Sequence, residues 1–442
     1  MGPAVDPVAA DETAPLRTSV VVIGGGIIGA SAAFFLARRG VPVVLCEKGQ
    51  IGGEQSSRNA GWCRKTGRDS REIPLIIESL RLWAGMNELV EAETGFRTTG
   101  ILFLCDTDAD IARREAWLEH ARLHQLDTRM IGPDEIATLL PGASRPFKAA
   151  LYTPSDGRAE PQKAAPAIAA AARRQGAIVL TRCAVRSVET TAGRAGAVVT
   201  ERGRIVCDAV ILAGGAWSSL FCGNLGLRLP QLRIRTSVMR TTPLEGAPET
   251  SALGDGFLFR KRLDGGYTVT SLASEIAEIV PDSFRFFFDF LPLARLEHRS
   301  YRLVVGRRFL EEWRLARRWN PDEPSPFEAT RTLDPAPVTA HNDAALDTLT
   351  KCFPAFANAK VVEQWAGMID VTPDVVPVIS PVESLPGFII ATGFSGHGFG
   401  IGPAAGRLAA QLVSGESPLV DPTPFRFSRF IDGSQPKPEP AI

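Results

Sequence analysis

SVVVIGGGIIGASAAFFLARRGVPVVLCEK, residues 19–48, is the stretch that decides the fold. A β-branched run over Val20–Ile23 leads into spaced glycines, and small and apolar residues then keep helical spacing up to Gly40. A second apolar run, Val41–Cys46, follows. This order predicts a βαβ unit with the spacing GxGxxG at the turn from strand to helix.

Each glycine of this turn, and the acid after the second strand, has a physical role in binding a dinucleotide. Gly24 allows the tight turn, Gly26 lets the backbone approach a pyrophosphate, and Gly29 lets the helix pack on the strand. Glu47 stands 18 residues beyond Gly29, where its carboxylate accepts hydrogen bonds from both ribose hydroxyls. A glycine turn without a ligand is the alternative, and the motif alone leaves NAD and FAD open. The candidate nucleotide-binding residues are Gly24, Gly26, Ile27, Ile28, Gly29, Glu47 and Lys48.

Length and charge limit the class of protein and its partners. The 442 residues are enough for about two to three domains with sizeable cores. The 49 basic residues balance 49 acidic residues, so no overall charge attracts nucleic acid or an anionic membrane. No apolar run approaches the roughly 20 residues that span a bilayer, and the first 17 residues lack the pattern of a secretory signal. We expect no nucleic-acid partner and no transmembrane segment.

The cysteines indicate the compartment. They are scattered, odd in number and without a CxxC pair, and several lie in apolar strand-like runs. This favours reduced thiols in the cytoplasm over a disulfide framework or a zinc site, and no metal is expected. The seven are Cys46, Cys63, Cys105, Cys183, Cys207, Cys222 and Cys352.

Periodicity and turn residues predict the remaining elements. Residues 1–16 read as a disordered leader, and residues 52–62 as a polar, glycine-bounded loop with a cap. A strand meander over 184–206 precedes a buried strand over 208–217, which rejoins the first sheet. The other expected elements are helices over 74–92, 108–126, 161–174 and about 403–413, an antiparallel sheet over 231–271, and strands over 101–105 and 387–391.

The segment 284–319 has an unusual composition. Five phenylalanines between Phe284 and Phe290 precede eight arginines between Arg295 and Arg318. One interpretation is a helix pair that binds a membrane surface or a partner. The other, which Glu297, Glu311 and Glu312 favour because they interrupt the basic face, is a helical insertion with its arginines toward water.

Three distant pieces of the chain together resemble one family. They are the opening unit, the strand end ILAGGAWS at 211–218, and the closing WAGMIDVTPDVVPVIS at 365–380 with PGFIIATGFSGHGFGIGPAAGRLAAQLVSG at 386–415. This set resembles the D-amino-acid oxidase, glycine oxidase and sarcosine oxidase superfamily of FAD-dependent amine oxidoreductases. The resemblance covers about half the chain and is more specific than the glycine fingerprint alone.

The resemblance implies an α/β fold with two domains. A Rossmann-like FAD-binding domain is expected over residues 18–98, 155–228 and 362–425. A substrate domain with a mixed antiparallel sheet is expected over 99–154 and 229–361, with a helical insertion at about 281–335.

The resemblance also assigns residues to the flavin. The backbone from Gly396 to Gly400 and the following helix N-terminus would stabilise negative charge on the reduced isoalloxazine. His397 is a candidate proton donor or a ring-packing residue. For the loop residues at 56–61, the alternative is an ordinary capped turn. The implied cofactor-binding residues are Ser56, Ser57, Arg58, Asn59, Gly61, Val185, Ala213, Gly214, Trp217, Gly367, Gly396, His397, Gly398, Phe399 and Gly400.

The implied reaction is oxidation of a C–N bond in an amino acid or amine, with D-amino or N-substituted amino acids favoured. Hydride passes from carbon to flavin, the imine product hydrolyses, and dioxygen or another acceptor takes the electrons. No Ser/His/Asp triad or metal cluster is visible.

The chain departs from the family pattern where substrate and flavin are held. Ile369 replaces an arginine that grips a carboxylate in many relatives, so Arg64, Lys65 or Arg68 is a candidate replacement. A surface role for each is the alternative. Gly367 replaces a cysteine that tethers the flavin in sarcosine-oxidase-like members, so the FAD is expected to be non-covalent. Gly400 replaces a lysine of the same members, which weakens the case for an oxidase.

Asp370, beside the missing arginine, suggests a second hypothesis. A buried carboxylate near the flavin would favour a cationic amine such as a polyamine. The alternative is an acid that caps Thr372 or faces solvent.

Two other functions stay open at this level. One is a dehydrogenase of the same fold that passes electrons to a quinone or protein acceptor, with 284–319 as a contact for the acceptor or for a second copy. The other is a flavin-binding subunit that needs a partner chain for catalysis. The substrate side chain, its chirality and the oligomeric state are not determined by the sequence.

Overall fold

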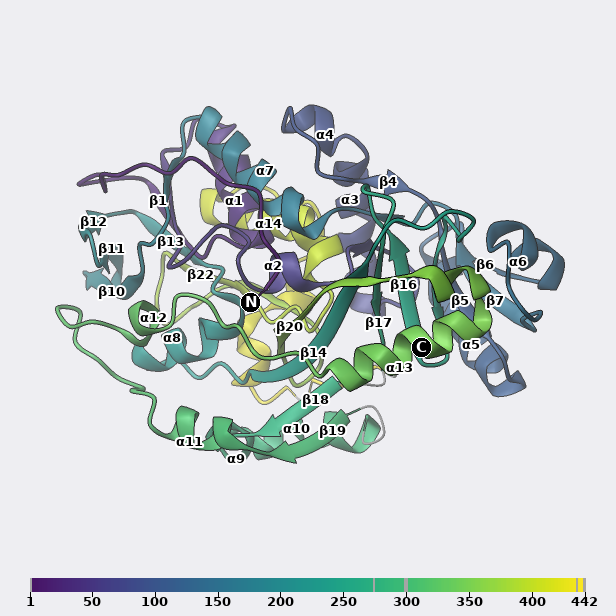
Figure 1. The fold of residues 1–442 in the computed structure, drawn as a ribbon. Coiled ribbons are helices and arrows are strands. Elements are labelled where there is room, and N and C mark those ends of the chain that lie inside the picture. The colour runs from purple at the N-terminus through teal and green to yellow at the C-terminus, as the bar shows by residue number, and fades with distance from the viewer. Residues whose placement is uncertain (1, 273–274, 298–300, 435, 440–442) are drawn as a thin grey trace.

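The computed structural model describes residues 2–272, 275–297, 301–434 and 436–439. Residues 298–300 of the expected insertion, with Arg299 among them, lie outside the described residues. The fold is mixed α/β, with two large sheets and several helical layers (Figure 1).

A six-stranded sheet in the order β21-β22-β13-β1-β2-β9 carries the opening unit. Its strands are parallel except for β21, which pairs antiparallel with β22. Side chains alternate between its two faces. Val20 and Val22 pack on one side of the sheet, and Val21 and Ile23 on the other. The strands are β1 (Val20–Ile23), β2 (Val43–Cys46), β9 (Ile178–Leu180), β13 (Ala209–Leu212), β21 (Val378–Pro381) and β22 (Phe388–Thr392).

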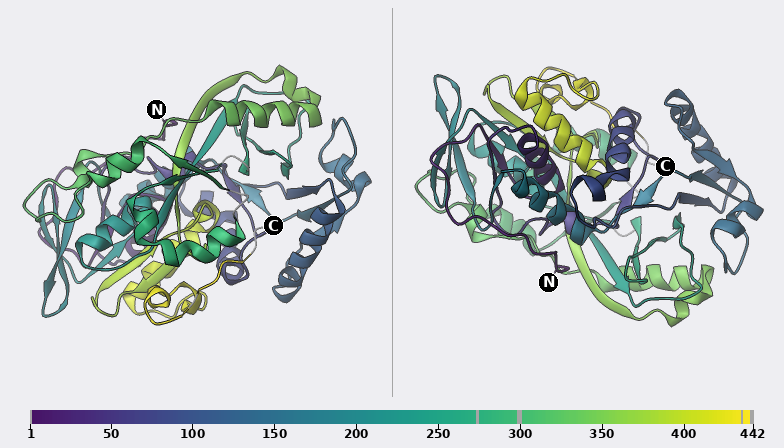
Figure 2. Two further views of the ribbon diagram at one scale, coloured as in Figure 1. Left: turned by 90° about the horizontal axis from the view of Figure 1, so that it is seen from below. Right: turned by 90° about the horizontal axis from the view of Figure 1, so that it is seen from above.

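Helices α1 (Ile27–Ala37), α7 (Pro161–Arg174), α14 (Gly398–Ser414) and α3 (Ile73–Ala84) pack together beside this sheet. Figure 2 shows the yellow α14 beside the purple α1 in its right view. Small residues permit this contact, because a Cβ on Gly406 would lie 2.5 Å from the Cβ of Ser31. The two ends of the chain are therefore joined in one core.

The meander lies on the opposite face. Strands β10 (Val185–Thr191), β11 (Arg194–Thr200) and β12 (Gly203–Val206) form the expected antiparallel sheet. Strand β13 pairs with β1 in parallel, which confirms that the run after the meander rejoins the first sheet.

A ten-stranded sheet makes up much of the rest of the molecule. Its longest pair joins β14 (Leu232–Thr241) and β20 (Val361–Val371) antiparallel, and helix α13 (Thr339–Cys352) packs on it. The antiparallel arrangement expected over 231–271 is confirmed. The other strands are β5 (Ile101–Cys105), β6 (Arg129–Ile131), β7 (Ala149–Thr153), β15 (Ser251–Gly254), β16 (Phe257–Lys261), β17 (Tyr267–Thr270), β18 (Glu275–Ile279) and β19 (Tyr301–Val305).

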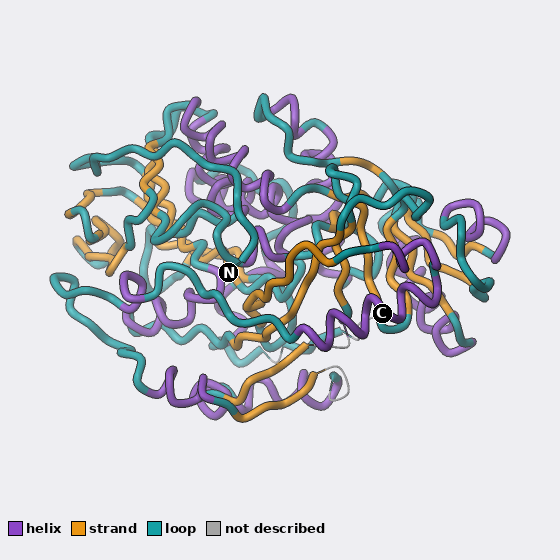
Figure 3. The backbone as a smooth tube through the Cα atoms, in the orientation of Figure 1, coloured by secondary structure: helices purple, strands orange, loops and turns teal. Residues whose placement is uncertain are grey.

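Short elements connect these layers, as the tube in Figure 3 shows. A small sheet joins β3 (Trp62–Cys63), β8 (Gly157–Arg158) and β4 (Arg97–Thr98). The remaining helices are α2 (Gln55–Arg58), α4 (Met86–Leu89), α5 (Asp108–Leu123), α6 (Pro133–Leu139), α8 (Ser218–Asn224), α9 (Pro281–Arg285), α10 (Phe287–Leu296), α11 (Arg307–Trp313) and α12 (Pro326–Ala329). Among the described residues, no helix combines the length and the apolar character needed to cross a bilayer.

The leader was wrongly expected to be disordered. The amide of Asp6 donates to the Gln162 carbonyl at 3.0 Å, and that of Asp11 to the Val179 carbonyl at 2.7 Å. Asp11 also pairs with Arg173 at 2.7 Å. Composition alone does not reveal these contacts, because their partners lie more than a hundred residues away.

Three element boundaries also differ from expectation. The helix over 74–92 breaks at Gly85 into α3 and α4, and residues 55–58 of the expected loop form the short helix α2. The closing helix begins at Gly398 rather than near 403, because its glycine-rich first turn packs against α1, where a Cβ on Gly402 would lie 2.8 Å from Ile27.

The insertion is not purely helical. It contains α9, α10 and α11, and also β19, which pairs in parallel with β18 at the edge of the large sheet (Figure 1). Its exposed face is apolar rather than only basic, with Phe288 at 84% and Trp313 at 70% exposure. Several of its arginines pair with acids, as Arg308 does with Glu278 at 3.1 Å.

Candidate functional site

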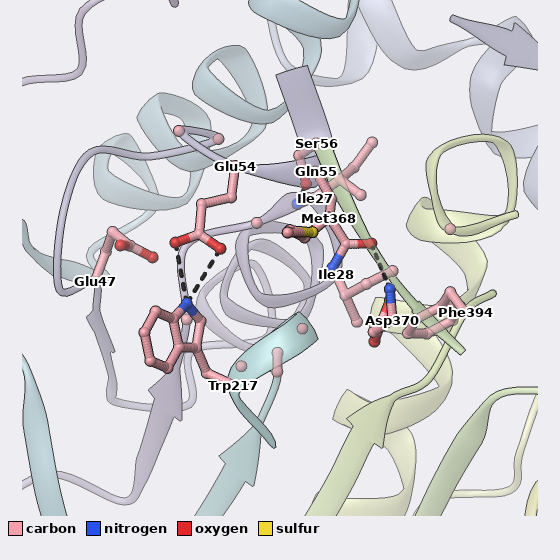
Figure 4. Close-up of a pocket in the computed structure, with 18 of the residues that line it drawn as sticks. Ile27, Ile28, Glu47, Glu54, Gln55, Ser56, Trp217, Met368, Asp370 and Phe394 are labelled. Atoms are coloured by element: carbon pink, nitrogen blue, oxygen red, sulfur yellow. Dashed lines mark hydrogen bonds between the residues drawn. The ribbon is translucent and has the colours of Figure 1, made fainter. Parts of the chain in front are cut away.

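One cavity collects the ends of the parallel strands, the helix α2 and the closing turn (Figure 4). Strands β1, β2 and β13 contribute the residues at their carboxyl ends, and β20 contributes residues 367–370. In open parallel sheets, ligands bind at this edge, where neighbouring strands diverge. The arrangement therefore makes this cavity the candidate site.

The glycine turn leaves no room for side chains. Gly24 has a φ of +107°, and a Cβ there would lie 2.3 Å from the carbonyl oxygen of Ala213. A Cβ on Gly29 would lie 1.9 Å from the Gly24 carbonyl oxygen. Gly26 precedes α1 with extended backbone and has no side chain of its own to cap the helix, so apart from Ser56, whose Oγ accepts from the Ile27 amide, the helix start stays open toward the cavity. Helix α1 has no acid in its first turn to compete with an anion.

Glu47 is tied to the turn by its own carboxylate. Its two oxygens accept hydrogen bonds from the amides of Gly25 at 2.7 Å and Gly49 at 2.6 Å. Burial raises the pKa of the Glu47 carboxyl. The acid therefore fixes the shape of the glycine turn in addition to the ribose contacts expected of it.

Glu54 is a second, half-buried acid of the cavity, and the sequence did not predict it. It accepts from Lys48 Nζ at 2.8 Å and from the indole nitrogen of Trp217 at 3.1 Å, as Figure 4 shows for Trp217. The ammonium of Lys48 lies 4.4 Å from the centre of the Trp217 ring. The residues next to Glu54, Gly53 and Gln55, do not predict this network. Its partner Trp217 lies at the end of a strand far along the chain.

The loop around α2 supplies both a cap and an anchor. Ser56 Oγ accepts from the Ile27 amide at 2.9 Å and so holds the start of α1. Arg58 is 4% exposed, and its Nη1 donates to the Ala366 carbonyl and pairs with Asp334, each at 2.8 Å. The guanidinium thus joins three distant segments beside the cavity.

Asp370 holds the closing turn. Its Oδ2 accepts from the Gly393 amide at 2.8 Å, Gln231 Nε2 at 3.0 Å and Thr392 Oγ1 at 3.2 Å. Its backbone amide donates to Gln55 Oε1 at 3.3 Å, as drawn in Figure 4. Burial raises the pKa of the Asp370 carboxyl, and the Gly393 hydrogen bond opposes the change. These partners fit a turn anchor, which neither hypothesis from the sequence included.

His397 precedes α14 and faces away from the cavity lining. Its Nδ1 lies 3.3 Å from Glu72 Oε2, and Arg68 Nη1 donates to the same oxygen at 3.1 Å. Burial lowers the pKa of His397, with Arg68 and Arg64 adding to the effect, so we take the imidazole as neutral at pH 7.

The other cationic candidates lie near His397, outside the cavity lining. Lys65 Nζ pairs with Asp127 at 3.1 Å, and Arg68 is engaged by Glu72. The guanidinium of Arg64 lies 5.5 Å from the Phe103 ring centre and donates to the Thr66 carbonyl. Burial lowers the pKa of Arg64 to about 9. Among the described carboxylates, none lies within ion-pair distance of Arg64.

Comparison with known proteins identifies the family. The family model DAO, described as FAD dependent oxidoreductase, matches residues 19–412. The chain belongs to this family. The L-amino acid deaminase from Proteus myxofaciens, solved in complex with anthranilate, is 35% identical with a TM-score of 0.94, over 97% of each chain.

Curated relatives of the DAO family agree with this assignment. The glycine oxidase of Pseudomonas aeruginosa is 26% identical and aligns over 92% of this chain and 97% of its own length. The mitochondrial dimethylglycine dehydrogenase of Mus musculus is 24% identical over 94% of this chain. The aligned part is 44% of that longer protein.

The residues of the cavity fit the FAD that the DAO family uses. At one end, the open start of α1 and the side-chain-free turn suit a pyrophosphate. At the other end, Gly396 has a φ of +84° and Gly398 begins α14, so backbone borders the cavity at these two positions, beside Phe394 and Phe399. The two ends are joined by residues of α2 and β20.

Most residues assigned to FAD from the sequence line this cavity. Those that do are Gly24, Gly26, Ile27, Ile28, Glu47, Lys48, Ser56, Arg58, Asn59, Val185, Ala213, Gly214, Trp217, Gly367, Gly396, Gly398 and Phe399, together with Asp370. The assigned residues outside the lining are Gly29, Ser57, Gly61, His397, Gly400, Arg64 and Lys65.

Gly61 and Gly400 lie outside the lining and allow neighbouring backbone segments to pack closely next to the cavity. Gly61 has a φ of +80°, and a Cβ there would lie 2.6 Å from the Ala159 carbonyl oxygen. A Cβ on Gly400 would lie 3.0 Å from the Cα of Cys63. Lining residues that the sequence analysis missed include Glu54, Gln55, Thr236, Phe327, Arg331, Met368 and Phe394. Of these, Met368 and Phe394 stand within the closing motifs at 365–380 and 386–415, which could have signalled them.

Proposed function

We propose that this DAO-family protein oxidises the C–N bond of an α-amino acid, with non-covalent FAD in the cavity. The observation that carries the proposal is the combination of a glycine-rich dinucleotide turn and a glycine-rich closing turn in one cavity. When bound, the flavin accepts a hydride from the carbon that bears the amine. The imine product then hydrolyses in water.

The sequence favoured D-amino or N-substituted amino acids, and the comparisons add a third candidate. The Proteus protein, similar along 97% of the chain, is an L-amino acid deaminase, so we place primary L-amino acids first. Dimethylglycine dehydrogenase supports the N-substituted class as the second candidate.

This chain's own residues position the reaction. Asp370 fixes Gly393 and so the path of the closing turn, and the start of α14 provides a positive dipole end beside it. A neutral His397, held by Glu72 and the Arg68 network, adds no charge at this end. The closing turn and the start of α14 therefore position the cofactor relative to the substrate.

Arg64 is our candidate for the substrate carboxylate, in place of the family arginine that Ile369 replaces. Lys65 and Arg68 are already paired with acids, whereas Arg64 donates to a backbone carbonyl. Arg64→Ala should raise the KM for amino acids about tenfold to hundredfold, because a charge-assisted hydrogen bond to the carboxylate is lost. The KM for the matching decarboxylated amines should change little. Equal effects on both substrate classes would remove this role.

The exposed apolar face of α10 and α11 is our candidate contact for the electron acceptor. Phe288 and Trp313 are 84% and 70% exposed, and apolar patches of this kind mark interaction sites. Phe288→Ser with Trp313→Ser should slow reoxidation by a quinone in phospholipid vesicles and leave reoxidation by dioxygen unchanged. Self-association of the wild type that the variant loses would instead indicate a second copy.

The seven free, buried cysteines agree with the reducing cytoplasm that we propose as the location of this protein.

The decisive experiment is an anaerobic titration of the yellow holoprotein with L-amino acids, D-amino acids, N-methyl amino acids and polyamines. Bleaching by L-amino acids is the expected result, and air should then restore the colour. Rapid recovery with peroxide indicates an oxidase, and slow recovery indicates a dehydrogenase with another acceptor. Bound FAD that no substrate bleaches would support a subunit that needs a partner chain.

A further inference from the structure

The chain that returns from the insertion crosses the nucleotide end of the cavity. Residues 330–333 follow α12 as a loop, which Figure 3 draws in teal. Phe327, Arg331 and Thr332 line the same cavity as Glu47. The carbonyl oxygen of Arg331 lies 2.6 Å from the position of a Cβ on Gly49, so the loop rests directly on the ribose side of the turn.

Both ends of this loop are anchored in the protein core. Phe327 is 4% exposed and packs against Trp217 and Trp319, with ring centroids 5.7 and 5.3 Å apart. Beyond the loop, the Val338 amide donates to Ser237 Oγ at 2.9 Å. Between these anchors the chain is also held at Asp334, which pairs with the buried Arg58. Residues 330–333 are therefore the part whose contacts decide whether the loop opens.

Polar contacts hold most of the loop, and the Leu333 side chain packs against the apolar core at its end. Lys48 Nζ donates to the carbonyls of Thr330 at 3.0 Å and Arg331 at 2.9 Å, and the Leu333 amide donates to Glu54. The Arg331 guanidinium forms a two-point ion pair with Glu201.

A second two-point pair braces the helix before the loop. Arg186 on β10 donates to Glu328 through two nitrogens, each at 2.9 Å. Arg331 is partly exposed, whereas Arg186 and Glu328 are largely buried. Two-point pairs hold their geometry, so the segment opens only when both pairs break, and such local opening leaves the rest of the fold intact.

We propose that residues 330–333 form a strap that gates FAD entry and release at the nucleotide end of the cavity. This inference rests on the proposed FAD site and adds a kinetic device to it. A gate limits both directions of binding, whereas a residue that only contacts the ligand affects release alone. Weakening a gate therefore raises the association rate of FAD, whereas loss of a simple ligand contact leaves that rate unchanged.

The test compares Arg186→Gln with a matched control, Arg204→Gln. Arg186 braces the strap without lining the cavity, whereas Arg204 pairs with Glu189 at 2.6 Å within the same meander and touches no strap residue. FAD release is followed by flavin fluorescence after dilution of the holoprotein, and association by its quenching in apoprotein made from that holoprotein. Circular dichroism and Tm check folding in each variant.

We expect Arg186→Gln to accelerate association and release at least fivefold each, with Arg204→Gln equal to the wild type. Raising NaCl from 0.1 to 1 M should accelerate both rates in the wild type and less in Arg186→Gln. Unchanged rates in Arg186→Gln, or a faster release with unchanged association, would overturn the strap while leaving the FAD site intact. A wild-type protein that binds no FAD would overturn the proposed function itself.

Discussion

The two ends of the cavity are built in different ways. The nucleotide end comes mainly from one contiguous stretch, residues 19–48, whose glycine spacing sets its geometry. The flavin end is assembled from β20, the turn at 392–398 and α2, and α2 lies hundreds of residues before the other two. A short motif can therefore encode the first end, whereas packing of two large sheets brings the second together.

The strongest test of the nucleotide end is Gly29→Ala. A Cβ 1.9 Å from the Gly24 carbonyl forces the strand and helix apart, at a cost of about 3 kcal/mol or more. We expect a protein without bound FAD and with a markedly lower Tm. Gly223→Ala, where a Cβ meets no atom within 4 Å, is the control and should keep both. A yellow Gly29→Ala protein would show that the turn is less constrained than the contact implies.

Glu47→Gln tests whether the acid acts through the same turn. Loss of charge weakens its bonds from Gly25 and Gly49 as well as ribose contacts, so the Kd for FAD should rise about tenfold to hundredfold. Isothermal titration of apoprotein with FAD measures the change, and Glu189→Gln is the exposed control. An unchanged Kd would contradict the role of Glu47.

Asp370→Asn tests the flavin end. The amide replaces the carboxylate that accepts from Gly393, Gln231 and Thr392, so the closing turn should shift and kcat should fall about tenfold, with FAD retained. Stopped-flow flavin reduction measures this loss, and Asp264→Asn is a surface control. Similar KM changes for neutral and cationic substrates are expected from a turn anchor. A selective rise for cationic amines would restore the hypothesis of cation recognition.

The smallest expected effect concerns the charge of His397. Because burial lowers its pKa in the folded state, the unfolded chain binds the proton more readily, and this contribution to stability declines as pH falls below 6.5. Glu72→Gln removes the carboxylate that raises the pKa of His397 and should lower it further. NMR titration of the five histidines measures both values. A rise of the His397 pKa in Glu72→Gln would contradict the assigned pairing.

Prediction succeeded where a signal is local and failed where it depends on distant partners. Strand and helix periodicity located β5, α7 and the meander, and the motif around Glu47 located the nucleotide end. The leader was misjudged because its partners Gln162 and Val179 are remote in sequence. The start of α14 was misjudged because Pro403, a residue typical of a helix start, lies inside the helix.

The sequence by itself determined the glycine turn, the acid after β2, the α/β fold and the family. The turn and the acid follow from spacing within a few tens of residues, which fixes local geometry, and the family follows from three such local motifs at distant places in the chain. Only the tertiary structure decided that Glu54 meets Trp217, that Asp370 holds Gly393, and that the loop at 330–333 crosses the nucleotide end. Those contacts join segments whose separation is set by sheet packing, and no local pattern records which segments a fold brings together.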